Sequence, residues 1–225
     1  MSGFDDPPAP DARPSVFLYG LPGGGKSFAG ERLRDAFGYR FEEGDAWLTD
    51  DLKASLARGE GFTAPQRDAF CGVVVRRAGE AVAEAATGGR GPVAVAQAMF
   101  KPAHRARIAE AAPGLLFVHA ACDELMRCAR LTARTNGNVD AANGARMADD
   151  FEPGAADPIL RGGAGVDAKL DKLLASARGW ESLSLHRDHS RLPRCACGNA
   201  VHPLQRSLDG VARDVCWRCP LVAEY

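Results

Sequence analysis

The stretch that decides the fold reads Gly20-Leu21-Pro22-Gly23-Gly24-Gly25-Lys26-Ser27. A strand-like apolar run at residues 15–19 precedes it, and residues 27–37 have the pattern of a helix. Glycines let the backbone turn so that successive N–H groups point inward, and the helix adds its positive end. The pattern predicts a phosphate-binding loop, with Lys26 on the β- and γ-phosphates and the Ser27 hydroxyl on Mg²⁺. Phe28 completes the predicted nucleotide contacts.

Length and composition limit the possible classes of protein. The chain has 225 residues, of which 46% are hydrophobic and 25% charged, as in a soluble globular protein. The net charge of −1 gives no overall attraction to nucleic acid, although a local basic patch stays possible. No apolar run is long enough to span a membrane, and residues 1–14 predict a disordered leader rather than a signal sequence. We therefore expect a cytoplasmic protein, in the host cytoplasm if it is viral.

Apolar runs alternate with helical stretches, which predicts an α/β fold with a five-stranded parallel sheet between helices. The predicted strands are residues 15–19, 39–43, 92–98, 115–120 and 182–185. The predicted helices are residues 27–37, 49–57, 65–86, 123–134 and 166–178, with Asp123 as an N-cap. Residues 135–144, rich in Asn and Gly, are expected to form a mobile loop. The composition changes after His186, so we expect a main domain at 15–185 and a tail at 186–225.

A carboxylate follows the second predicted strand, in the pair Gly44-Asp45. The carboxyl end of a parallel strand faces the crevice in which α/β proteins bind their ligands. There Asp45 can orient an acceptor hydroxyl, accept its proton, or bind Mg²⁺ through water. The alternative is that Asp45 only caps the helix that follows.

From the glycine-rich loop to about residue 180, the chain resembles the gluconokinase-like branch of small P-loop kinases, close kin of the shikimate kinases. Beyond the loop, the matching residues are Gly44-Asp45, Gly59-Glu60, Phe62-Thr63, Arg67, Phe70, Gln97-Ala98-Met99-Phe100-Lys101, His104-Arg105, Arg130-Leu131-Thr132-Ala133-Arg134 and the segment 147–153, which ends Phe151-Glu152-Pro153. The resemblance implies a P-loop kinase fold, ATP and Mg²⁺ as cofactors, and a lid near residues 127–147.

The resemblance also implies roles for five basic residues. Arg130 and Arg134 would contact ATP when the lid closes, with Arg130 catalytic beside Lys26 and Asp45. Three others would bind an anionic or polyhydroxylated acceptor: Arg67, Lys101 and Arg105. Several positions depart from the family pattern on the acceptor side, namely Trp47-Leu48-Thr49, Gln97, Phe100 and Asn136-Gly137-Asn138. Phosphoryl transfer is therefore expected, and the acceptor stays open.

Four cysteines form two close pairs near the C-terminal end, Cys195 with Cys197 and Cys216 with Cys219. Without a secretion signal, such pairs favour a tetrahedral zinc site over disulfides, and the pattern resembles a zinc ribbon. Zinc would be structural there, because so short a tail has little hydrophobic core. Two reduced pairs without metal are the alternative. Nearby arginines and Trp217 allow nucleic-acid binding, and packing against the main domain or a partner is equally compatible.

Three functions remain open. The first is an ATP-dependent kinase that phosphorylates a hydroxyl of a small polar metabolite, such as a gluconate-like sugar acid. The second keeps this chemistry on a nucleotide, or on a hydroxylated base or end within DNA or RNA bound by the tail. The third is a non-catalytic adaptor that responds to nucleotide.

Overall fold

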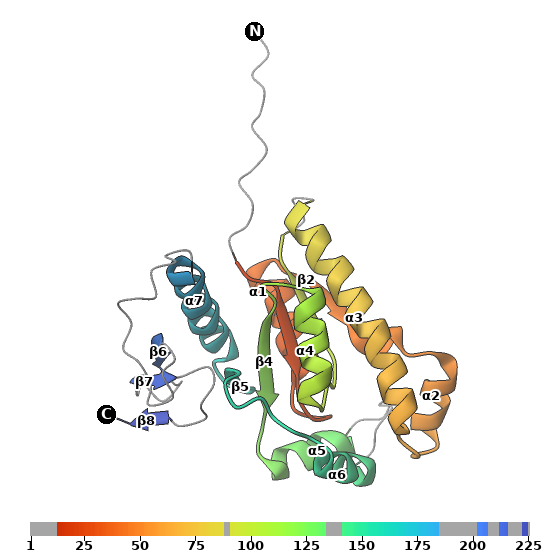
Figure 1. Ribbon diagram of the computed structural model, residues 1–225. Helices are drawn as coiled ribbons and strands as arrows, with labels where there is room; N and C mark the ends of the chain where they lie inside the picture. Colours follow the sequence, from red (N-terminus) through yellow and green to blue (C-terminus); the bar gives the residue numbers. More distant parts are fainter. Residues whose placement is uncertain are drawn as a thin grey trace.

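The computed structural model describes residues 13–87, 91–133 and 141–184, and the backbone of three short strands at 202–206, 212–215 and 222–224. The main sheet has five parallel strands in the order β2-β3-β1-β4-β5 (Figure 1). These strands are β1 (Val16–Tyr19), β2 (Arg40–Glu43), β3 (Val93–Ala96), β4 (Leu116–Ala121) and β5 (Ile159–Arg161). The short strands β6 (His202–Arg206), β7 (Ala212–Val215) and β8 (Val222–Glu224) pair as a separate antiparallel sheet.

Helices cover both faces of the main sheet and its carboxyl edge (Figure 1). They are α1 (Lys26–Phe37), the 3₁₀ helix η1 (Gly44–Trp47), α2 (Asp50–Ala57), α3 (Ala64–Thr87), α4 (Pro102–Ala111), α5 (Glu124–Ala133), α6 (Ala141–Asp149) and α7 (Val166–Ser184). The helices α5 and α6 lie together beyond the carboxyl ends of the strands (Figure 1). Among the helices described, none is long and apolar enough to cross a membrane.

The alternation of side chains along β1 produces two hydrophobic cores. Phe17 and Tyr19 pack with α2, α3 and α4, whereas Val16 and Leu18 pack with α1 and α7 on the opposite face. All four residues of β1 are buried, and so are all four of β3. Burial on both faces explains why these strands read as continuous apolar runs.

The five-stranded parallel sheet is confirmed, but the predicted position of its fifth strand is wrong. Residues 182–184 continue α7, and the fifth strand is β5, which pairs with β4. Only Leu160 of β5 is buried, so its sequence lacks the apolar run that marks the other strands. Helix α4 was not predicted, because only two of its residues are buried. Helix α6 occupies part of the predicted loop at 135–144.

Gly30 of α1 allows the helix to lie directly on β2. A Cβ atom at this position would stand 2.1 Å from Cε2 of Phe41. We expect Gly30→Ala to lower the free energy of unfolding by about 1–3 kcal/mol through overpacking. This cost is at least as large as the gain of roughly 1 kcal/mol that alanine brings to a helix interior.

Gly72 of α3 provides the matched control, because a Cβ atom there meets nothing within 4 Å. We expect Gly72→Ala to raise the free energy of unfolding by about 0.5–1 kcal/mol. Denaturant titration of both variants measures the contrast. A Gly30→Ala variant as stable as Gly72→Ala would contradict the packing argument.

Candidate active site

The glycine-rich loop joins β1 to α1 at the carboxyl edge of the sheet. Gly20 has a φ of 142°, and a Cβ atom there would lie 2.4 Å from the Ala120 carbonyl oxygen, so only glycine fits beside β4. Gly25 caps α1 with a φ of 98°. The Lys26 ammonium donates hydrogen bonds of 3.0 Å to the carbonyl oxygens of Gly20 and Leu21. The loop therefore curls around the lysine as a phosphate cradle requires.

Arg130 of α5 lies over this loop. Its Nη1 atom donates a hydrogen bond of 3.3 Å to the Gly23 carbonyl oxygen. A hollow beside this contact is lined by Gly23, Gly25, Ser27, Phe28, Arg130, Ala133 and Gly163. Arg130 is thus placed where it can reach a bound nucleotide. Arg134 lies outside the described residues, so its predicted role is untested.

A second cavity extends from the same loop toward α2, α3 and α6. From the loop it takes Pro22, Gly23, Gly25, Lys26 and Ser27, and its polar residues beyond the loop are Glu43, Asp45, Arg67, Gln97, Lys101, His104 and Asp150. Its apolar side chains are Leu48, Leu56, Phe62, Phe70, Met99, Phe100 and Met147. The phosphate loop and the predicted acceptor residues Asp45, Arg67 and Lys101 therefore share one cavity.

Asp45 lies in η1 and is exposed to this cavity. The cap of α2 is Thr49, whose hydroxyl accepts a hydrogen bond of 3.4 Å from the Leu52 N–H. The alternative that Asp45 caps the following helix is therefore wrong. In the described part of the chain, no group holds the Asp45 carboxylate, so it is available to a ligand.

Arg67 and Lys101 are each paired with a carboxylate that follows α6. Arg67 Nη1 lies 2.6 Å from Asp150 Oδ2, and Lys101 Nζ lies 2.7 Å from Glu152 Oε1. Arg67 Nε also donates to the Phe62 carbonyl oxygen at 2.9 Å. These contacts tie the end of α6 to α3 and to the turn before α4. Sequence reasoning gave Asp150 no role, although it lies within the 147–153 segment of the resemblance.

Arg105 is not among the residues that line the cavity, so its position does not support the predicted contact with the acceptor. The residue is 5% exposed, and its guanidinium donates to the carbonyl oxygens of Met99 at 2.7 Å and Glu152 at 2.8 Å. The same group stands 4.3 Å from the centre of the Tyr19 ring. Arg105 thus stabilises the turn before α4 and the segment after α6, a packing role that the sequence did not indicate.

Tyr19, the residue before the loop, is a second feature that the sequence did not indicate. Its hydroxyl donates a hydrogen bond of 2.6 Å to Asp157 Oδ2 and accepts one of 2.9 Å from the Gly154 N–H. Burial, together with the bond to Asp157, raises the pKa of the Tyr19 phenol above its ordinary value. The phenol therefore stays protonated and fixes the start of the loop to residues 154–157.

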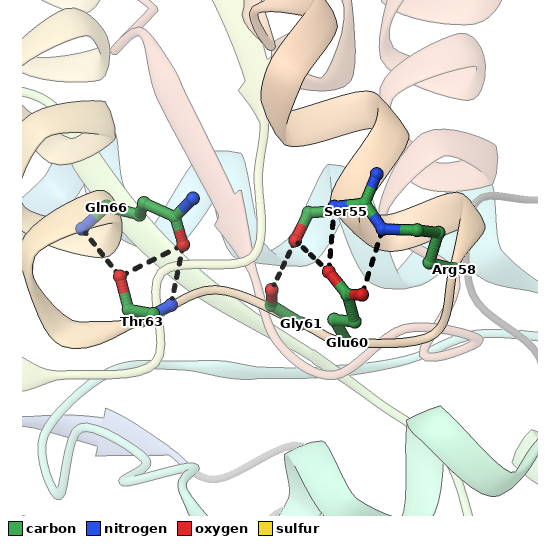
Figure 2. A network of polar contacts seen from close by, with 6 residues as sticks. All are labelled: Ser55, Arg58, Glu60, Gly61, Thr63 and Gln66. Carbon is green, nitrogen blue, oxygen red and sulfur yellow. Dashed lines mark hydrogen bonds and ion pairs between the residues drawn. The ribbon is translucent and has the colours of Figure 1, made fainter.

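Two of the residues that line the cavity, Gly61 and Phe62, lie in the turn between α2 and α3, which a polar network holds in place (Figure 2). Ser55 donates a hydrogen bond of 3.0 Å to the Gly61 carbonyl oxygen. Thr63 and Gln66 form a capping box, in which the Thr63 N–H donates to Gln66 Oε1 at 2.9 Å and the Gln66 N–H donates to Thr63 Oγ1 at 3.4 Å. The network thus positions Phe62 on the cavity wall.

The predicted zinc ligands Cys195, Cys197, Cys216 and Cys219 lie outside the described residues. Within the described ranges, no cluster of three or more His, Cys, Asp or Glu side chains could hold a metal ion. The zinc site, the nucleic-acid contacts of the tail and the domain boundaries stay predictions.

Comparison with known proteins supports the fold. No family model and no curated protein matches the chain. A gluconokinase from Sinorhizobium meliloti 1021 is 23% identical, with a TM-score of 0.63, covering 78% of this chain and 97% of its own. A sugar kinase from Janibacter sp. HTCC2649 is 20% identical, with a TM-score of 0.60, covering 72% and 94%. The chain therefore shares the α/β fold of these small-molecule kinases.

Proposed function

We propose that the protein is an ATP-dependent kinase that transfers the γ-phosphate to a hydroxyl group of a small molecule. One observation carries this proposal. A single cavity is lined by Lys26 and Ser27 of the phosphate loop and by the Asp45 carboxylate at the end of β2. A phosphate donor and a hydroxyl acceptor can therefore meet in one place.

The residues divide the chemistry between them. Lys26 and the loop N–H groups would hold the β- and γ-phosphates, and Arg130 would offset the negative charge that spreads over the transferred group. Asp45 would orient the acceptor hydroxyl and take its proton as the new O–P bond forms and the bond to ADP breaks. Ser27 comes directly after Lys26 in sequence and lines the same cavity, so its hydroxyl would be the protein ligand of Mg²⁺. Bound Mg²⁺ supplies charge neutralisation.

The likeness to a gluconokinase and a sugar kinase makes a sugar or a sugar acid the first acceptor to test. Transfer of labelled γ-phosphate from ATP to a panel of alcohols tests the proposal. We expect transfer to at least one alcohol. ATP hydrolysis that no acceptor accelerates would contradict it and would favour the adaptor hypothesis.

The nucleic-acid alternative depends on the cysteine pairs and arginines of the tail, whose side chains lie outside the described residues. Its test is transfer of labelled phosphate to polynucleotide by the full chain and by a chain that ends at residue 186. Loss of transfer on truncation, with small-molecule transfer retained, would support it.

A further inference from the structure

We infer that the acceptor is an uncharged alcohol carried on an apolar or aromatic body, rather than an anionic polyol. The inference rests on the proposed function, because it concerns the acceptor half of the same cavity. Three observations support it. The basic side chains are already paired with protein groups, the Asp45 carboxylate lines the cavity, and many of the other lining residues are apolar.

The three basic residues that the sequence predicts for acceptor binding are already paired with protein groups. Arg67 is paired with Asp150 at 2.6 Å, and Lys101 is paired with Glu152 at 2.7 Å. Arg105 is buried against backbone carbonyl oxygens. A carboxylate on the acceptor would have to displace a protein carboxylate to gain a cation, so its net gain would be small.

One carboxylate makes this part of the cavity unfavourable for an anion. Asp45 lines the cavity and is exposed to it. His104 adds no compensating charge near neutral pH, because burial lowers its pKa below the ordinary value. An uncharged acceptor avoids repulsion by the Asp45 carboxylate.

Beyond the phosphate loop, about half of the residues that line the cavity are apolar. Phe62 and Phe70 meet edge to face, with ring centroids 6.3 Å apart. Phe100, Met99 and Met147 line the same cavity. Each hydroxyl of a polyol placed against these side chains would lose water without gaining a partner, whereas a ring would gain contact area.

The first experiment measures kcat/KM of the full-length chain for four alcohols. They differ in net charge and in whether the hydroxyl is carried on a polyol or on an aromatic ring. The neutral and anionic polyols are glucitol and gluconate, and the neutral and anionic aromatic alcohols are benzyl alcohol and 4-(hydroxymethyl)benzoate. We expect kcat/KM for benzyl alcohol to exceed that for each of the other three alcohols by tenfold or more. A preference for gluconate would overturn the inference and leave the kinase proposal intact. If none of the four alcohols raises ADP formation above the Lys26→Ala background, the inference and the kinase proposal would both be overturned.

The second experiment removes the protein carboxylate that pairs with Arg67. Asp150→Asn removes the partner of Arg67, so the activity ratio of 4-(hydroxymethyl)benzoate to benzyl alcohol should rise fivefold or more. Asp167→Asn is the matched control, because Asp167 pairs with Arg32 at the same distance of 2.6 Å and neither residue lines the two cavities. Equal ratios in wild type and both variants would contradict the role assigned to the Arg67–Asp150 pair.

Discussion

Replacing Lys26 with alanine is expected to lower kcat for phosphoryl transfer by about a thousandfold or more, with the fold retained. The ammonium group lies 3.0 Å from the Gly20 and Leu21 carbonyl oxygens, and Lys26 lines the cavity. Water cannot replace it, because a mobile solvent shell does not pre-organise charge toward the transferred phosphate. Single-turnover transfer of labelled γ-phosphate measures the loss.

Lys53→Ala serves as the control for this substitution. Lys53 lies on α2 and is 3.8 Å from the fully exposed Asp50 carboxylate, outside both cavities. Its removal should change kcat by less than about twofold, because exposed ion pairs contribute little. A Lys26→Ala variant that retains wild-type turnover would remove the basis for a phosphate site at the loop.

Replacing Asp45 with asparagine is expected to reduce kcat by about 10²- to 10⁴-fold, the range typical of a lost general base. The amide keeps the size of the side chain but takes up no proton from the acceptor hydroxyl. Binding of ATP should change little, since the proposed nucleotide contacts lie on the loop and α5. Comparison of kcat with the KM for ATP distinguishes loss of a catalytic group from loss of nucleotide binding.

Asp51→Asn is the matched control, because Asp51 is an exposed aspartate in the first turn of α2. It should leave kcat within about twofold of wild type, as expected of a surface change. If Asp45→Asn and Asp51→Asn were equally active, Asp45 would have no part in proton transfer.

The success of the sequence-based prediction follows from local signals. The glycine-rich loop and the buried runs of β1 and β3 each carry their pattern within a few residues, so these strands and the loop between β1 and α1 were predictable. Strand β5 has one buried residue, and α4 has two, so neither shows a clear period. Their positions depend on tertiary packing that a short window of sequence does not contain.

The acceptor half was less predictable for a different reason. Motif position identified Arg67 and Lys101, but their partners Asp150 and Glu152 follow in sequence only after three further helices. Arg105 matched the motif as well, yet α4 buries it against Tyr19. A sequence pattern gives the type of a side chain and not whether the fold has already satisfied its charge.

The strand order has a consequence for how the chain folds during synthesis. β1 lies in the middle of the sheet and pairs with β3 and β4. Val16 therefore cannot form its strand pairs until Ala94 and Leu116 have been synthesised. Until those residues leave the ribosome, a fully apolar strand has no partner and stays open to aggregation. High contact order of this kind slows folding, so the expression yield should depend on temperature and chaperone supply more strongly than equilibrium stability would suggest.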